Sequence, residues 1–241
     1  MRTIGILGGM GPAAAADFYL RIVASHGALR DQDHPPCILY SATQVPDRTA
    51  FLLGAGPDPT PELEAAARLI EATGADFIAM PCNSAHAFLA AMRAAVSIPI
   101  LDMIALAAGA VARVVPRARR IGILATTGTV EAGLYGERLG NHGLQPVYPD
   151  ADVQQQVMAA IKDVKAGRSG GGSDARLLHA ARHLSEHDAD CIIMGCTEVP
   201  LALDAADSPL AAIDGNQMLV DTTLALAVGR LDFEEVADAV R

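Results

Sequence analysis

Two cysteines occupy matching places in two segments of this chain. Cys82 ends the segment 75–82, Ala-Asp-Phe-Ile-Ala-Met-Pro-Cys, and Cys196 ends the segment 189–196, Ala-Asp-Cys-Ile-Ile-Met-Gly-Cys. Ala, Asp, Ile, Met and Cys recur at the same places in both segments. Two thiols that face each other can take a proton from one side of an atom and deliver a proton to the other side. We therefore expect this pair to invert a carbon centre, which suits it better than a reaction that needs a single nucleophile.

A second pair of segments repeats in the same order. Residues 5–11 read Gly-Ile-Leu-Gly-Gly-Met-Gly, and residues 122–128 read Gly-Ile-Leu-Ala-Thr-Thr-Gly. Each segment is an apolar strand that runs into a glycine- or threonine-rich turn. The two repeats together predict that the chain holds two copies of one α/β unit, each with a cysteine after an apolar strand.

Strand and helix patterns alternate along the chain. The predicted strands cover residues 3–7, 37–41, 75–80, 98–101, 120–125 and 191–194. The predicted helices cover residues 13–25, 60–73, 84–95, 104–115, 130–141, 153–166, 175–186 and 233–240. This alternation predicts the α/β class, with a parallel sheet flanked by helices in each half. Functional residues should then lie at the carboxyl ends of the strands, where both cysteines fall.

Composition limits the kind of protein and its partners. The chain has 241 residues, of which 51% are hydrophobic and 19% are charged, enough to bury the core of one or two globular domains. The net charge is −10 and no run of Lys or Arg stands out. We therefore expect no nucleic-acid partner and no anionic membrane patch. An anionic ligand would need local positive groups.

The sequence also indicates a cellular compartment. No apolar segment approaches the roughly 20 residues that a membrane span needs, and the N-terminus leads directly into a strand. We expect a cytoplasmic protein, in which the four cysteines stay as thiols. Cys37 and Cys191 lie inside apolar strand patterns and are assigned to the core.

A nucleotide site is the alternative use of the first glycine-rich turn. The turn reads Gly8-Gly-Met-Gly-Pro12, which lacks the Gly-x-Gly-x-x-Gly spacing of dinucleotide-binding loops. No acidic residue closes the second strand, where a ribose hydroxyl would need one. The turn can still offer backbone N–H groups to a carboxylate at a helix N-terminus.

Several motifs together resemble the cofactor-independent aspartate/glutamate racemase superfamily, over nearly the whole chain. The motifs are Pro81-Cys-Asn-Ser-Ala-His86, Gly195-Cys-Thr-Glu-Val-Pro200, Gly-Ile-Leu-Gly-Gly-Met-Gly-Pro at 5–12, Pro46-Asp-Arg-Thr49, Ala125-Thr-Thr-Gly-Thr129 and Lys165-Ala-Gly167. The match is to the aspartate-racemase branch. Glutamate racemases usually carry Asp-Ser where this chain has Gly9-Met10, and His where it has Glu198. Ser84 departs from the usual Thr but keeps the hydroxyl, with substrate preference left in doubt.

The resemblance implies a fold, an activity and an assembly. It implies two pseudo-symmetric α/β domains, residues 1–102 plus 216–241 and residues 103–215, with the active site in the cleft between them. It implies racemisation of an acidic amino acid, aspartate first and glutamate second, without a cofactor or a metal, in a homodimer. The alternatives are a broad-specificity amino-acid racemase, a relative that decarboxylates or isomerises a small dicarboxylate, and a non-catalytic carboxylate-binding protein.

The predicted chemistry is a proton transfer between two thiols. A free cysteine has a pKa near 8.5, so roughly a few per cent is thiolate at neutral pH. Cys82 precedes the helix predicted from Ser84, and its thiolate should feel the positive end of that helix dipole. Cys196 precedes Thr197-Glu-Val-Pro, a poorer helix start.

The remaining candidate residues would bind the substrate. Hydrogen bonds from Asn83, Thr126, Thr127 and Thr197 could stabilise the α-carboxylate as it gains enolate-like charge, although local turn and capping roles are about as plausible. Arg48 and Lys165 resemble the family positions that hold a side-chain carboxylate. Met10, Ser84 and Glu198 complete the predicted substrate-binding set.

Four features keep two readings each. His86 lies one helical turn after Cys82 and would either activate it or satisfy its own hydrogen bonds locally. Glu198 would either keep Cys196 protonated or bind the ligand ammonium. His179, His183 and His187 recur every four residues and suggest a metal site, but the outer two would stand about 12 Å apart on a helix, too far to share one ion, so we read them as a solvated stripe. The glycine-rich segment 168–174 is read as a connector, with a lid as the alternative.

Overall fold

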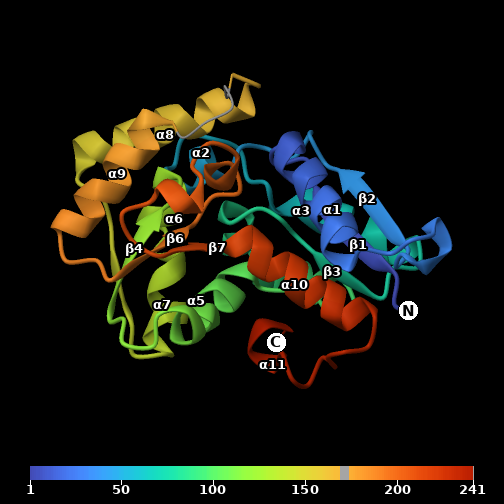
Figure 1. Cartoon of the computed structure of the whole chain (residues 1–241). Coiled ribbons are helices and arrows are strands. Elements are labelled where there is room, and N and C mark those ends of the chain that lie inside the picture. The colour runs from blue at the N-terminus through green and yellow to red at the C-terminus, as the bar shows by residue number, and fades with distance from the viewer. Residues whose placement is uncertain (169–173, 241) are drawn as a thin grey trace.

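The computed structural model describes residues 1–168 and 174–240 and confirms the α/β class. Two parallel sheets form its centre (Figure 1). The first sheet has the order β2-β1-β3, from the strands Ile4–Gly8 (β1), Cys37–Ser41 (β2) and Phe77–Ala79 (β3). The second has the order β5-β4-β6-β7, from Arg120–Leu124 (β4), Gln145–Val147 (β5), Cys191–Met194 (β6) and Ala212–Asp214 (β7).

The helices flank both sheets. In the first half they are Pro12–His26 (α1), Arg48–Leu52 (α2), Thr60–Ala72 (α3) and Leu89–Ala95 (α4). In the second half they are Met103–Val114 (α5), Thr127–Glu131 (α6), Leu134–Gly140 (α7), Ala151–Lys165 (α8) and Ala175–Glu186 (α9), and the chain ends with Gly215–Ala227 (α10) and Ala237–Val240 (α11). Short 3₁₀ turns cover Asp31–Asp33, Ser84–Phe88, Val199–Leu201 and Ala205–Asp207. No helix among the described residues is long and apolar enough to cross a membrane.

The sequence repeats occupy equivalent places in the two sheets. The repeat at 5–11 and 122–128 forms β1 and β4, and each of these strands pairs with a strand on both sides. The cysteine repeat forms β3 and β6, which lie beside those strands, with Ile4 opposite Phe77 and Ile121 opposite Cys191. Cys82 therefore follows the carboxyl end of β3, and Cys196 follows the carboxyl end of β6. Ligand sites of α/β folds lie at this end of parallel strands.

Four predicted elements differ from the structure. The helix predicted for 233–240 forms only over Ala237–Val240 (α11). The helix predicted for 130–141 is two helices, α6 and α7, because the chain turns at Gly133, which has a φ of 62° that favours glycine. The strand predicted for 98–101 is reduced to a single bridge between Ile78 and Ile100. The α-helix predicted from Ser84 begins only at Leu89, after a 3₁₀ segment.

The last part of the chain packs on both halves. Helix α10 contacts α1 and α5, which is visible in Figure 1, where it lies between the two halves. The N–H of Arg2 donates to the carbonyl of Ala227, and the rings of Phe77 and Phe233 pack 5.8 Å apart. One buried apolar cluster continues from the first sheet through α5 into the second sheet. The division at residues 102 and 216 stays a prediction, and residues 169–173 of the predicted loop lie outside the described residues.

Candidate active site

Cys82 lies buried beneath the first strand–helix turn. Its Sγ donates to the carbonyl of Met10 at 3.4 Å and lies 3.7 Å from the hydroxyl of Ser84. The turn itself depends on Gly9, which has a φ of 91° and packs against the backbone of Ala42, leaving no room for a side chain. Sequence and backbone together therefore place Met10 over the thiol.

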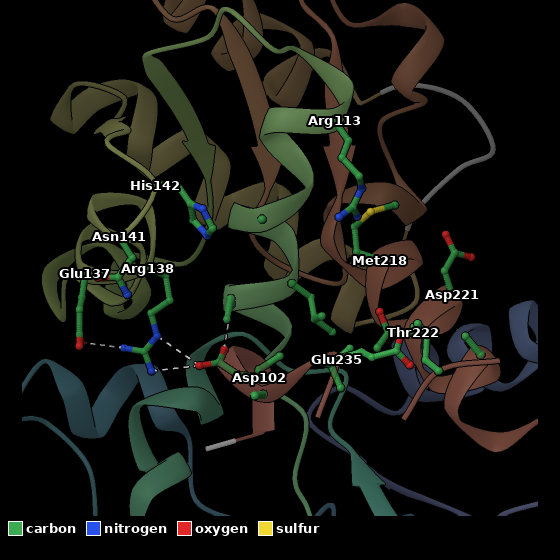
Figure 2. Close-up of a pocket in the computed structure, with 18 of the residues that line it drawn as sticks. Asp102, Arg113, Glu137, Arg138, Asn141, His142, Met218, Asp221, Thr222 and Glu235 are labelled. Carbon is green, nitrogen blue, oxygen red and sulfur yellow. Dashed lines mark hydrogen bonds and ion pairs between the residues drawn. The ribbon is translucent and has the colours of Figure 1, made fainter. Parts of the chain in front are cut away.

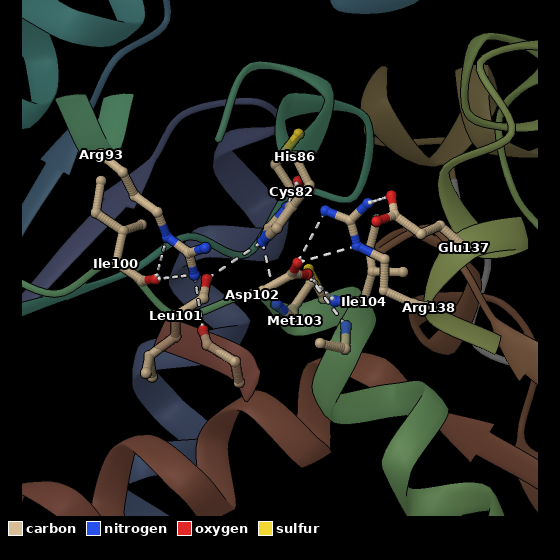
Figure 3. A network of polar contacts seen from close by, with 12 residues as sticks. Cys82, His86, Arg93, Ile100, Leu101, Asp102, Met103, Ile104, Glu137 and Arg138 are labelled. Atoms are coloured by element: carbon tan, nitrogen blue, oxygen red, sulfur yellow. Dashed lines mark hydrogen bonds and ion pairs between the residues drawn. The ribbon is translucent and has the colours of Figure 1, made fainter. Parts of the chain in front are cut away.

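His86 faces the backbone of Cys82 and not its sulfur. Its Nδ1 lies 2.8 Å from the Cys82 carbonyl, while its Nε2 accepts the N–H of Met103 at 3.1 Å (Figure 3). Because Nε2 accepts, Nδ1 must carry the proton and donate to Cys82. Burial lowers the pKa of His86, which keeps this ring neutral. The reading in which His86 activates the thiol directly is not supported by this arrangement.

The same ring explains why no α-helix starts at Ser84. An α-helical first turn would give the Cys82 carbonyl to the backbone N–H of His86. That N–H instead donates to Asn83, three residues back, and the imidazole takes the Cys82 carbonyl. The side chain thus competes with the backbone, and the chain follows a 3₁₀ path. The expected dipole of a regular helix at Cys82 is absent from this part of the structure.

A charged pair continues this network into the second half. Asp102 caps α5 by accepting the N–H groups of Ile104 and Ala105, at 2.9 and 3.1 Å. Its other oxygen pairs with Arg138 of α7 at 3.1 Å (Figure 3). Burial would raise the pKa of Asp102, but the N–H of Ala105 and the guanidinium of Arg138 stabilise the carboxylate, and its pKa lies below the usual value. The cap therefore stays ionised and ties α5 to α7.

Cys196 meets a carboxylate instead of a carbonyl. Its Sγ donates to Glu198 Oε2 at 2.9 Å, and both residues are buried. Burial and the charge of Glu198 raise the pKa of Cys196 well above its usual value, against a smaller opposing effect of Lys165. At neutral pH this cysteine rests as a thiol. Of the two readings of Glu198, this geometry favours the one in which it keeps Cys196 protonated.

The two halves touch at the cysteines. The Thr197 hydroxyl donates to the carbonyl of Pro81 at 3.4 Å, next to Cys82 in the chain. A methyl group on Gly11 would lie 2.9 Å from Glu198 Oε1, which has no hydrogen-bond partner. The turn of the first half therefore lies against the carboxylate of the second.

The two predicted cations, Arg48 and Lys165, differ in how far their charged groups are already bound by the protein. Arg48 is buried, and its two terminal nitrogens donate to the carbonyls of Val45, Pro46 and Met10 at 2.9–3.3 Å. Only its Nε is buried without a partner. Lys165 ends α8. Desolvation lowers the pKa of Lys165, whereas the carboxylate of Glu198 and the thiolate forms of Cys196 and Cys82 raise it, and the net shift is upward. Its ammonium thus stays charged beside both thiols.

Two of the predicted hydroxyls are committed to local structure. The Thr126 hydroxyl accepts the N–H of Thr129 at 3.3 Å and the hydroxyl of Thr49 at 3.2 Å, which makes it the cap of α6. The Thr127 hydroxyl accepts from Gln154 Nε2 at 3.3 Å. Thr126 therefore has a capping role, and neither hydroxyl is without a partner.

Asn83 is held by a residue that the sequence analysis did not identify. The hydroxyl of Tyr135, in α7, donates to Asn83 Oδ1 at 2.6 Å, and burial raises the pKa of Tyr135 so that it keeps its proton. This leaves Asn83 Nδ2 buried and without a partner. A tyrosine in a helix carries no sequence signal for such a contact, which arises only when α7 packs on the first half.

Three predicted site residues each have a buried polar atom without a partner: Asn83 Nδ2, Arg48 Nε and Glu198 Oε1. Asn83 follows Cys82 in the chain, Arg48 shares the Met10 carbonyl with Cys82, and Glu198 accepts from Cys196. Buried polar groups normally find a partner, so such atoms mark places for water or ligand. Two donors and one acceptor beside two thiols suit a zwitterion with a carboxylate and an ammonium group. Cys37 and Cys191 lie apart from this set, in strands, and burial raises the pKa of each to about 11.

A hollow in the described structure lies away from the cysteines. It has a volume of about 960 Å³ and lies between α5, α7, α10 and the C-terminal residues (Figure 2). Its walls carry both basic and acidic side chains, and neither cysteine lines it: the charged and titratable residues include Arg113, Arg138, His142, Glu137, Asp221 and Glu235. This mixture of charges selects no ligand class, so the cysteine pair and not this hollow is the candidate active site.

The fold and the site define a class of protein: an α/β isomerase of the racemase type, with a cysteine after a strand of each sheet. The chain belongs to the Asp/Glu/hydantoin racemase family, whose profile matches residues 7–227. The broad specificity amino-acid racemase RacX of Bacillus subtilis (strain 168) is 29% identical over 229 residues, 92% of this chain and 96% of that protein. Both the predicted family and the predicted enzyme class, an isomerase, are confirmed.

Solved structures share the fold over almost the whole chain. Aspartate racemase of Picrophilus torridus superposes with a TM-score of 0.78 and 26% identity, covering 97% of each chain. PH1733 of Pyrococcus horikoshii OT3, an aspartate racemase homologue, superposes with a TM-score of 0.70 and covers 95% of this chain and 100% of its own. At 22% identity, the second comparison bears on the fold alone.

Proposed function

We propose that this racemase inverts the α-carbon of an acidic amino acid, with aspartate ahead of glutamate, and that Cys82 and Cys196 are its two acid/base residues. The observation that carries the proposal is the opposite surroundings of the two thiols. Cys196 is held as a thiol by Glu198, while Cys82 has no carboxylate within hydrogen-bond reach among the described contacts. One acid and one base in the same site are what inversion of a weakly acidic C–H group requires.

The proposed mechanism follows from this difference. Cys82 first releases its proton to solvent, its thiolate then takes the α-proton from one face, and Cys196 delivers its own proton to the other face. The resulting Cys82 thiol and Cys196 thiolate return to their starting states by proton exchange with solvent. For the opposite enantiomer the two roles are exchanged. Negative charge spreads onto the α-carboxylate during the transfer, and Asn83 Nδ2 is the proposed donor to it, joined by the Thr197 hydroxyl when substrate displaces its hydrogen bond to Pro81. No cofactor takes part in these steps.

Lys165 supports an acidic substrate more strongly than Arg48 does. Its ammonium stays charged and already interacts with the charges of the site. The terminal nitrogens of Arg48 are used by three backbone carbonyls, which suits a residue that holds the turn over Cys82. We assign the side-chain carboxylate of the substrate to Lys165, with Arg48 Nε as its neighbour, and Met10, Ser84 and Glu198 as the remaining lining.

Broad specificity is the second candidate. It is favoured by the 29% identity with a broad-specificity amino-acid racemase over nearly the full length of both proteins. Chiral chromatography after incubation with each L-amino acid, without pyridoxal phosphate, separates the two. The acidic-substrate proposal expects D-aspartate to form fastest and D-glutamate next. Equal turnover of neutral amino acids would leave only the broad-specificity enzyme, and no inversion at all would favour a dicarboxylate enzyme or a binding protein.

Three further proposals accompany this function. We propose that the chain forms a homodimer, which light scattering of the purified protein tests. We propose a cytoplasmic location, where the four cysteines remain reduced, which cell fractionation tests. We also propose that residues 1–102 plus 216–241 and residues 103–215 move as two domains about the site, which hydrogen exchange with and without aspartate tests.

A further inference from the structure

Three side chains that the proposed function does not use converge at one end of α8 and α9. Asp150 directly precedes α8, and His183 and His187 lie at the end of α9. One potential ligand atom from each of the three lies within 4.8 Å of the others. The two helices pack against each other and lie side by side in Figure 1. The cluster therefore joins two elements that are distant from Cys82 in the first sheet.

The spacing of the first two ligands suits a single ion. His183 Nε2 lies 3.6 Å from Asp150 Oδ2. Two ligands bound to one tetrahedral Zn²⁺ at 2.0–2.2 Å lie roughly 3.3–3.6 Å from each other. This pair needs almost no movement to share an ion. The imidazoles of His183 and His187 already lie 4.0 Å apart, centroid to centroid.

Hydrogen bonds leave both imidazoles able to act as ligands. His187 Nδ1 lies 2.7 Å from the carbonyl of His183, so it donates there and leaves Nε2 with a free lone pair. His183 Nε2 accepts the N–H of Asp150 at 3.3 Å, so its lone pair points toward that residue, and a bound ion would replace this hydrogen bond. A backbone carbonyl that fixes one ring nitrogen is the usual support of a metal-bound histidine.

The carboxylate of Asp150 is also turned toward the histidines. Asp150 occupies the N-cap position of α8 with extended backbone angles, where Asp side chains commonly accept an N–H of the first turn. Its side chain makes no such bond. It is 71% exposed and faces His183 instead, which leaves it free to move by the small distance that binding requires.

We propose that Asp150, His183 and His187 form a binding site for a divalent transition metal of the Zn²⁺ type, with water as a fourth ligand. Two imidazoles and one carboxylate favour Zn²⁺, Co²⁺ or Ni²⁺ over Mg²⁺ or Ca²⁺, which prefer oxygen ligands. The bound ion fastens the start of α8 to the end of α9. His179, which is exposed one turn earlier on the same helix, is not part of the site.

The test is a titration of the metal-free full chain with Zn²⁺ alone, followed by calorimetry and by thermal unfolding. The expected result is one Zn²⁺ per chain at this site and a Tm that rises with Zn²⁺ concentration, because the ion binds the folded state. Mg²⁺ should leave the Tm unchanged. His187→Ala and Asp150→Asn should weaken binding by at least roughly 10–100-fold, the loss typical even of outer-shell partners of metal sites. The matched control, His179→Ala, should bind Zn²⁺ like the wild type.

Cysteine thiolates are also Zn²⁺ ligands, so the titration is repeated with Cys82→Ala and Cys196→Ala combined. The proposal expects the site to persist there and to disappear when His187→Ala is added. Should the combined cysteine variant not fold, the difference between His187→Ala and His179→Ala in the otherwise native chain decides. Equal Zn²⁺ affinity in these two variants, or no Zn²⁺-dependent rise in Tm in the wild type, overturns the proposal. Neither outcome bears on the racemase activity, which the readouts do not use.

Discussion

The two cysteines follow equivalent strands, yet their surroundings differ. Cys82 lies under a turn and meets the carbonyl of Met10 and the hydroxyl of Ser84. Cys196 meets the carboxylate of Glu198, whose charge holds the proton on the sulfur. The repeat thus preserves the position of the thiol at the end of a strand. The residue two positions later, Ser84 after Cys82 and Glu198 after Cys196, determines how strongly the thiol holds its proton. A two-base reaction needs this kind of difference, since one thiol must be ionised while the other is protonated.

Removing either thiol should have the largest effect. Cys82→Ala and Cys196→Ala each take away the acid/base group of one face, and we expect racemisation to fall by at least roughly 10²–10⁴-fold in both variants. Polarimetry with L- and D-aspartate measures this. Cys191→Ala, in strand β6, is the matched control because it removes a thiol of the same sheet outside the site. Near wild-type racemisation in either active-site variant would refute the comparison.

Removing the charge beside Cys196 should shift the pH profile. Glu198 raises the pKa of Cys196, so Glu198→Gln should lower it. A plot of kcat/KM against pH should be bell-shaped, and both limbs report the thiol pair Cys82 and Cys196. The alkaline limb marks the pH at which this pair loses its last proton. We expect that limb to move to lower pH in Glu198→Gln, as measured by kcat/KM for aspartate against pH. Glu62→Gln, an exposed residue of α3, is the control. An unmoved alkaline limb would show that Glu198 does not hold the proton of Cys196.

Removing Lys165, the cation at the end of α8, should lower activity on acidic substrates far more than activity on neutral ones. A hydrogen bond to a charged group contributes about 1.5–3 kcal/mol, so Lys165→Ala should lower kcat/KM for aspartate roughly 10–150-fold. Turnover of alanine should change far less. Lys162→Ala, exposed on the same helix, is the control. Arg48→Ala should also lower kcat/KM for aspartate more than for alanine, and in addition lower the Tm, because three carbonyls lose a donor. Unchanged kcat/KM for aspartate in both Lys165→Ala and Arg48→Ala would remove the acidic-substrate proposal and leave broad specificity.

The buried histidine behind Cys82 should give the smallest effect, and mainly on stability. Burial lowers the pKa of His86 in the folded state below its ordinary value of 6.5. The unfolded chain therefore binds this proton more readily, and stability should be full above about pH 6.5 and fall as the pH drops below it. His86→Asn should lose that pH dependence and cost about 1–3 kcal/mol at pH 8 by leaving a buried group unpaired. Urea unfolding at pH 5.5 and pH 8 measures both, with exposed His142→Asn as the control. An identical acid-side loss in His86→Asn would assign the effect to another group.

Sequence patterns predicted the parts of the fold that repeat or alternate. Strands β2 and β6 and helix α9 match their predicted bounds, since apolar runs and clear end signals define them. Strands β5 and β7 were not predicted, because three residues are too short to show a period. The 3₁₀ segment after Cys82 was also missed, because it depends on a side chain that competes with the backbone.

The candidate site was predictable to a similar degree. The repeat alone identifies both cysteines, and the resemblance supplies Asn83, Arg48, Lys165 and Glu198. The capping role of Thr126 and the contact of Tyr135 with Asn83 arise only when separate elements pack together. No local pattern encodes them, so they needed the structure.

Hydrogen exchange at the α-carbon in heavy water tests the central claim most directly. If Cys82 and Cys196 act from opposite faces, the thiol that takes the α-proton keeps it while the other, already exchanged with solvent, delivers deuterium. Mass spectrometry of separated enantiomers at early times should then find deuterium in the product and almost none in the recovered substrate. A single base that serves both faces would return solvent deuterium to both alike. Equal labelling of early substrate and product would contradict the two-thiol account.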